Sequence, residues 1–160
     1  MGVGLGARWL AQRCGLQSSV SETFMAGLFH DTGKLVLLKA IDDCRTKGHW
    51  RQALSDQLVM ELLKNLYTEH GAKLIEQWNL PNAYAQAARD HHLSVVDDAT
   101  PLTSLLRVAD LACTKLGLDL DHVPDIAIAS SVHVELLNLD QIAIAELEIM
   151  LEDNVLKLAT

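Results

Sequence analysis

Apolar residues recur at steps of three and four along almost the whole 160-residue chain, and this periodicity restricts the fold more than any other feature. The alternation of β-branched and aromatic residues that marks strands is nearly absent. The periodicity predicts helices over about Leu5–Cys14, Ser21–Ile41 with a break at Gly33, Ser55–Asn79, Tyr84–His92, Leu102–Leu116, Val123–Leu137 and Gln141–Leu158. We therefore expect an all-α bundle of about six or seven helices.

Two of the predicted helices carry apolar faces that should fix their packing. On the long third helix this face comprises Leu58, Leu62, Leu66, Leu74 and Trp78, with Trp78 as a core anchor. On the last helix it comprises Ile144, Leu147, Leu151, Val155 and Leu158. Packing on the chain's own core is the favoured reading for the last helix. Assembly with a partner or a second copy is the alternative.

Length and charge limit the classes of function. A chain of this length suits one domain over residues 1–160, and a helix pattern that starts directly after the Gly-rich Met1–Gly6 is compatible with a missing upstream helical portion. Thirteen basic and 21 acidic residues give a net charge of −8, which argues against direct nucleic-acid binding. The scattered cysteines and the lack of a long apolar run or signal peptide predict a cytoplasmic protein with no membrane contact.

Histidine and aspartate residues near the predicted helix ends form the candidate site. Imidazole and carboxylate are good ligands for divalent transition metals, so one or two Fe, Mn, Ni or Zn ions are the expected cofactors. Hydrogen-bonded pairs without a metal are the alternative, since buried polar groups are normally paired in either case. Asp110 in particular lies on an apolar helix and needs a metal, a cation or a hydrogen-bond network. The candidate metal ligands are His30, Asp31, His70, His91, His92 and Asp110.

Several of these residues lie in a recognisable context. Residues 26–35 read AGLFHDTGKL, which resembles the signature of HD-type domains. His70-Gly71 followed by Trp78-Asn79-Leu80-Pro81 is similar to a stretch of HDOD domains, the HD-related output domains of bacterial signalling proteins. Residues 88–92, ARDHH, and residues 108–110, VAD, resemble the two motifs that follow. The resemblance spans residues 24–116, and the Trp-Asn-Leu-Pro segment favours HDOD over other HD relatives.

The resemblance implies roles for individual residues. His30 and Asp31 would form the central pair. His70 and one or both of His91 and His92 would complete a second metal position, and Asp110 would close the first. In an active relative, Asp31 and Lys34 would be the catalytic residues, because a corresponding lysine lies near the substrate phosphate in related HD-GYP enzymes. From the residues alone, a solvated Lys34 is the favoured interpretation.

The resemblance also implies a function, but the sequence departs from the family pattern at two points. The chain has no His before His30, and the "GYP" element of cyclic-di-GMP hydrolases is missing after His92. We therefore expect a signal-transduction output module that acts on a signalling protein partner or an oligomer. A metal or a small phosphorylated or nucleotide ligand would be its signal. The alternative is a metal-dependent phosphohydrolase acting on a phosphomonoester or phosphodiester, and a further one is a scaffold that assembles through its last helix.

Overall fold

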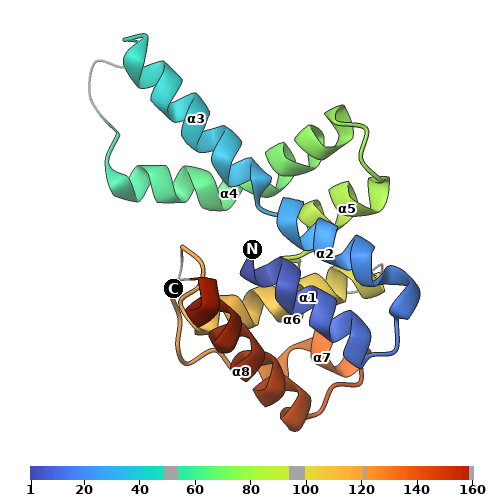
Figure 1. Ribbon diagram of the computed structural model, residues 1–160. Coiled ribbons are helices and arrows are strands. Elements are labelled where there is room, and N and C mark those ends of the chain that lie inside the picture. Colours follow the sequence, from blue (N-terminus) through green and yellow to red (C-terminus); the bar gives the residue numbers. More distant parts are fainter. Residues whose placement is uncertain (49–53, 94–99, 121, 159–160) are drawn as a thin grey trace. The chain divides into compact units, whose positions relative to one another are not determined.

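The computed structural model describes residues 1–48, 54–93, 100–120 and 122–158, and it describes side chains up to residue 154. Within these ranges the chain is helical and contains no strand, which confirms the predicted all-α class (Figure 1). The helices are α1 (Gly2–Arg13), α2 (Val20–Phe29), α3 (Thr32–Thr46), α4 (Asp56–Gln77), α5 (Asn82–Asp90), α6 (Pro101–Lys115), α7 (Val132–Leu136) and α8 (Gln141–Leu158). Two single 3-10 turns, η1 (Gln17–Ser19) and η2 (Ile128–Ser130), complete the described part. None of these helices is long and apolar enough to cross a membrane.

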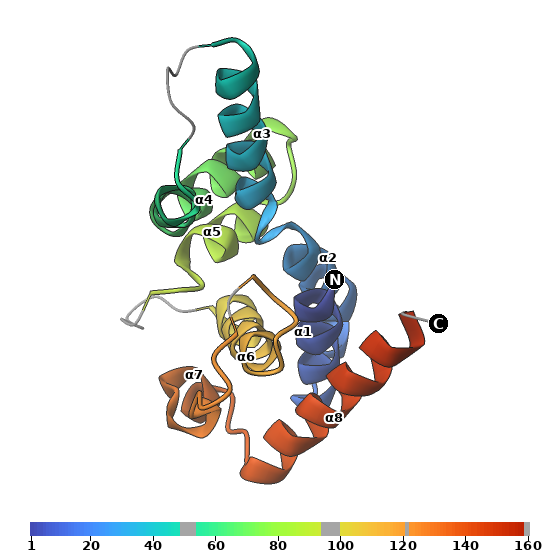
Figure 2. The same ribbon diagram turned by 90° about the vertical axis from the view of Figure 1, so that its left-hand side faces the viewer.

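The chain forms two compact units, and the prediction of one domain over residues 1–160 stays a prediction. The first unit joins Met1–Leu28 to His91–Thr160, so it is built from both ends of the sequence. Its centre is α6, which packs against α1, α7 and α8 and lies between α1 and α7 in Figure 2. The apolar residues Leu105, Leu106, Val108 and Ala109 of α6 are fully buried, because the helix has neighbours on several sides.

Helix α8 covers the first unit with the apolar stripe that the sequence predicts. Ile144, Leu147 and Leu151 are buried, and Glu148 receives a hydrogen bond of 2.7 Å from Lys115 of α6. The side chains of Val155 and Leu158 lie outside the described residues. Packing of this helix on its own unit is thus confirmed for the three described members of the stripe.

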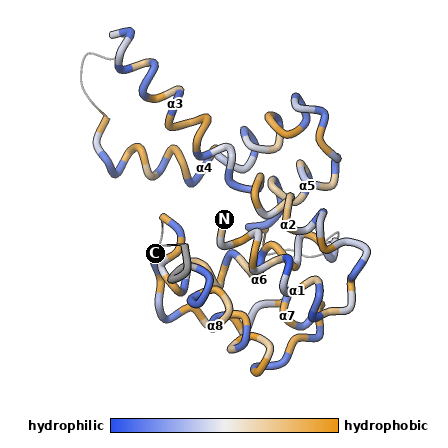
Figure 3. The backbone as a smooth tube through the Cα atoms, viewed as in Figure 1, coloured by the Kyte–Doolittle hydropathy of each residue, from blue (hydrophilic) through white to orange (hydrophobic). Residues whose placement is uncertain are grey.

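The second unit, Phe29–Asp90, consists of α3, α4 and α5. Helices α3 and α4 approach closely at Gly33, where a Cβ atom would lie 1.8 Å from the backbone oxygen of Tyr67. Only a glycine allows this approach. The first half of α3 is apolar and its second half polar, as Figure 3 shows. The helix nevertheless continues through the polar stretch after Asp42, where the prediction had ended it.

Two predictions about the packing of α4 and Trp78 are wrong. The face of α4 that is buried carries Leu63, Tyr67 and Ile75, whereas Leu58, Leu66 and Trp78 of the predicted face are exposed. Trp78 is 51% exposed and contacts the ring of Phe29 edge-on, so it is no core anchor.

The break after α2 falls at His30-Asp31, which precedes the predicted break at Gly33. The predicted helix over Val123–Leu137 is reduced to η2 and the short α7. Pro124 supplies no N–H group and disfavours helical geometry in the residue before it, which opposes a helix start at Val123.

Candidate functional site

The six predicted metal ligands are divided between the two units. His30, Asp31 and His70 belong to the second unit, and His91, His92 and Asp110 belong to the first. Each set is positioned by the ends or the buried faces of helices. His30 and Asp31 form the junction between α2 and α3, while His91 and His92 follow the last residue of α5.

In the first unit, His91, His92 and Asp110 form a cluster. One potential ligand atom from each lies within 4.8 Å of the others. His91 is fully buried, Asp110 is 3% exposed, and His92 is exposed. The two imidazole rings lie 4.1 Å apart between centroids at an angle of 42°. Two imidazoles and a carboxylate are the kind of donor set that binds a borderline divalent metal.

A basic side chain lies against this cluster. Arg107 stands one helical turn before Asp110 on α6, and its Nη1 donates to Oδ2 of Asp110 at 3.2 Å. The same nitrogen lies 2.7 Å from Nδ1 of His92. Because a guanidinium only donates, Nδ1 of His92 accepts this hydrogen bond and the proton of the neutral ring is on Nε2. Arg107 therefore occupies one potential ligand atom of His92 and one of Asp110, and its charge opposes that of a metal ion.

In the second unit, Asp31 is likewise paired with a basic side chain three residues further on, in the first turn of α3. Nζ of Lys34 donates to Oδ2 of Asp31 at 2.7 Å and lies 4.8 Å from the centroid of the Tyr67 ring. Nε2 of His30 lies 3.4 Å from the same carboxylate oxygen. The side chain of Lys34 is only 16% exposed. The favoured prediction of a solvated Lys34 is thus wrong, because the ammonium is held by a carboxylate and an aromatic face.

His70 stands apart from both pairs. It lies on the exposed side of α4, and no cluster of three potential ligands among the described residues includes it. Its assignment as a metal ligand stays a prediction that the geometry of its unit does not support.

One carboxylate oxygen that the ion pairs do not use nevertheless fits a divalent metal. Oδ1 of Asp31 is buried, and no described residue donates a hydrogen bond to it. A buried carboxylate oxygen without a donor is costly, and a cation would remove that cost. His30 with Asp31, and His91 and His92 with Asp110, are accordingly the residues that could hold a metal.

Sequence reasoning overlooked two residues near the cluster, Arg107 and His133. Arg107 could have been found, because a basic residue three positions before a buried Asp on a helix reaches the carboxylate. His133 has no motif around it. It is 4% exposed, and its Nδ1 lies 3.1 Å from Oγ of Ser104. Burial lowers the pKa of His133, and a hydrogen bond to the backbone of Leu93 partly offsets this effect.

Comparison with known protein families matches residues 1–94 to the HDOD domain. The chain belongs to the HDOD domain family. The match includes the His30-Asp31 junction, His70 and the His91-His92 pair, whereas Asp110 and Arg107 of this HDOD chain lie beyond it. No curated protein and no solved structure matches the chain. The predicted family is confirmed, and the HDOD domain fits a regulatory or output module.

Proposed function

We propose that this HDOD chain is a signal-transduction output module that binds a divalent transition metal reversibly and does not turn over phosphoesters. Its output would be a contact with a signalling protein or with a second copy of itself. The ion would be Fe, Mn, Ni or Zn, with one or two ions per chain. His91, His92 and Asp110 would hold one, and His30 with Asp31 would contribute to another.

The observation that carries this proposal is the pairing of both candidate carboxylates with a cation three residues away. Asp31 is paired with Lys34 at 2.7 Å, and Asp110 with Arg107 at 3.2 Å. In both cases the spacing is three residues, so the two partners lie on one helix face. Each carboxylate is thus neutralised without a metal, and an entering ion must displace or oppose the resident cation.

This arrangement favours regulation over catalysis. A bound divalent ion would supply Lewis acidity and an activated water, which is the chemistry of hydrolytic HD relatives. A catalytic centre must keep its metal through every turnover, whereas a signal must bind and leave. Two positive side chains next to the ligands weaken metal binding, which suits a metal that must bind and leave as a signal. Arg107 would hold the cluster together when the metal is absent, because it bridges His92 and Asp110.

One observation favours the alternative of a metal-dependent phosphohydrolase. Oδ1 of Asp31 is buried without a donor among the described residues, as a resident metal ligand would be. In that reading Asp31 would bind the metal and Lys34 would contact the phosphate. The pairing of Lys34 with Asp31 and Tyr67 counts against it, because a lysine held in this way is not available to a substrate.

Metal titration tests the proposal directly. Apoprotein prepared without a His tag is titrated with Mn²⁺, Ni²⁺ and Zn²⁺, and with Fe²⁺ under anaerobic conditions, against a competing chelator. The proposal predicts saturable binding that His91→Ala combined with Asp110→Ala, or His30→Ala combined with Asp31→Ala, reduces. Arg107→Gln should bind about tenfold more tightly, because it removes a charge beside the ligands.

Arg13→Gln is the matched control. Arg13 is exposed and pairs at 3.5 Å with Glu146, which is not a candidate ligand. It should bind metal as the wild type does. A protein that binds none of the four metals, or an Arg107→Gln variant that binds them more weakly than the wild type, would contradict the proposal.

A further inference from the structure

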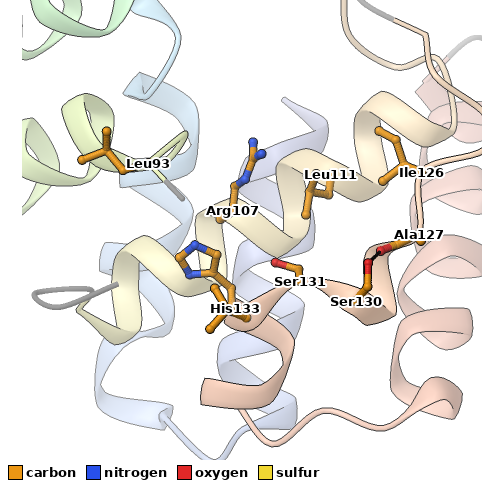
Figure 4. A pocket seen from close by; sticks show the side chains of 9 residues that line it. Leu93, Arg107, Leu111, Ile126, Ala127, Ser130, Ser131 and His133 are labelled. Carbon is orange, nitrogen blue, oxygen red and sulfur yellow. Dashed lines mark hydrogen bonds between the residues drawn. The ribbon is translucent and has the colours of Figure 1, made fainter. Parts of the chain in front are cut away.

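The first unit contains a cavity of about 370 Å³ on the side of α6 that faces η2 and α7. Figure 4 shows Arg107 and Leu111 reaching it from α6, and Ser130, Ser131 and His133 from the segment that contains η2 and α7. The remaining wall is apolar and consists of Leu93, Ile126, Ala127 and Val132. Volumes of this order lie at the small end of ligand sites in proteins.

Among the described residues that line the cavity, Arg107 is the one with a permanent charge, and that charge is positive. Arg107 has five N–H donors, and the two on Nη1 are directed to His92 and Asp110. No described residue accepts a hydrogen bond from Nε or Nη2 of Arg107, so the rest of the fork is available. No acidic side chain occurs among the described residues that line the cavity. The planar fork of a guanidinium matches the oxygens of a carboxylate or a phosphate.

The other polar groups of the cavity wall suit the same ligand group. Ser131 lines the cavity, and its hydroxyl makes no hydrogen bond with any described residue, so it can donate to an anion. Ser130 donates to the carbonyl of Ala127 at 2.7 Å. His133 lies within hydrogen-bonding distance of Ser104 and is buried, so its ring is held in the wall.

The apolar part of the wall indicates what accompanies the anionic group. Leu93 is 55% exposed and Val132 is 38% exposed, so both leave apolar surface open at the cavity. Covering such surface with an apolar group is favourable. An inorganic ion would leave it uncovered.

We propose that this cavity binds a small organic oxyanion, with a carboxylate or phosphate group on Arg107 and Ser131 and an apolar body against Leu93, Leu111, Ile126 and Val132. The family match ends at residue 94. All the lining residues except Leu93 lie after that point, from Arg107 onward. The binding itself does not rest on the proposed function, although such a ligand would be a signal for the module.

Arg107 would connect this cavity to the cluster of His91, His92 and Asp110. Its Nη1 is bonded to the cluster while Nε and Nη2 remain for the cavity. A bound anion would draw the guanidinium toward itself and weaken its contact with Asp110. The cavity and the cluster would then influence each other's ligands through one side chain.

The test uses two-dimensional amide NMR and calorimetry on the full chain with a chelator present, so that no metal contributes. The probes are hexanoate and hexyl phosphate, which separate the two possible anionic groups, with hexanol, hexylammonium and inorganic phosphate as comparisons. We expect saturable binding of at least one organic anion, with shifts concentrated at Leu111, Ile126 and Ser131. Arg107→Gln should weaken it about tenfold or more, as loss of a charge-assisted hydrogen bond does.

Two further variants keep the result decisive if Arg107→Gln folds poorly. Ala127→Phe fills the cavity from an exposed position and leaves Arg107 in place, so it should abolish binding. Arg13→Gln should leave binding unchanged. The proposal is overturned if neither organic anion saturates, if hexanol or inorganic phosphate binds as tightly as the organic anions, or if Ala127→Phe binds as the wild type does. These outcomes would leave the metal-binding proposal untouched, because no metal is present.

Discussion

Gly33 is the residue whose replacement should disturb the second unit most. A Cβ atom at this position would lie 1.8 Å from the carbonyl oxygen of Tyr67 and 2.7 Å from the amide nitrogen of Gly71, so backbone would have to move. We expect Gly33→Ala to lower the free energy of unfolding by about 3 kcal/mol, the upper end of the range for overpacking. Urea unfolding measures this change.

Gly48→Ala is the matched control for Gly33→Ala. Gly48 has a φ of +68°, and no described residue lies within 4 Å of an added Cβ, so the left-handed backbone is what opposes the substitution. Its expected cost is about 1 kcal/mol. If Gly33→Ala is no less stable than Gly48→Ala, the close approach of α3 and α4 is not as described.

His133 should make the stability of the first unit depend on pH. Burial lowers its pKa below the ordinary value of 6.5, so the folded state holds fewer protons than the unfolded state just below that pH. The free energy of unfolding contributed by His133 is therefore complete above pH 6.5 and decreases as the pH falls through 6.5 toward the lowered pKa. His133→Gln should remove this part of the slope between pH 7.5 and pH 5.5, measured by urea unfolding.

His122 provides the comparison, because it is exposed. His122→Gln should keep the wild-type slope. A slope that is the same in His133→Gln and in the wild type would show that His133 titrates in the folded protein as it does in the unfolded chain.

At the scale of the helices, α8 offers a test with an internal control. Leu147 is fully buried in the first unit, while Ile149, two residues further on, is 59% exposed. We expect Leu147→Ala to cost about 2–5 kcal/mol of unfolding free energy, as for other buried leucines. Ile149→Ala should change stability by no more than about 0.5 kcal/mol. Similar losses in both variants would mean that α8 does not pack through the Leu147 face.

Helix positions followed from the sequence more reliably than helix faces did. The stripe of α8 was identified correctly, because Ile144, Leu147 and Leu151 lie on one side and charged residues on the other. Helix α4 has apolar residues on more than one side, since it packs against both α3 and α5. The periodicity therefore does not predict which of these residues are buried. Leu63 and Tyr67 are buried, while Leu58 and Leu66 are exposed.

At the scale of the whole molecule, the sequence identified the chemistry of the candidate site but not its electrostatic state. The motif around His30-Asp31 and the His91-His92 pair revealed the residue types that bind metals. The charge of the candidate carboxylates is balanced by ion pairs, of Asp31 with Lys34 and of Asp110 with Arg107. The spacing of three residues was visible, but whether such a pair is buried or solvated depends on helices that pack against it.

The cavity beside Arg107 could not have been predicted. Its lining comes from Leu93, from α6 and from the segment between Ile126 and His133, which periodicity had assigned to one continuous helix. Only the interruption of that helix between η2 and α7 places Ser131 and His133 opposite α6.

The measurement that tests the account most directly is phosphoester turnover by the full chain loaded with Mn²⁺, the wild type being compared with Asp31→Ala. The substrates are p-nitrophenyl phosphate, bis-p-nitrophenyl phosphate and cyclic-di-GMP. An output module with both carboxylates paired should give the same background rate in both proteins on all three substrates. Turnover that disappears in Asp31→Ala, and falls in Lys34→Met while metal affinity does not decrease, would contradict the account and establish a phosphohydrolase.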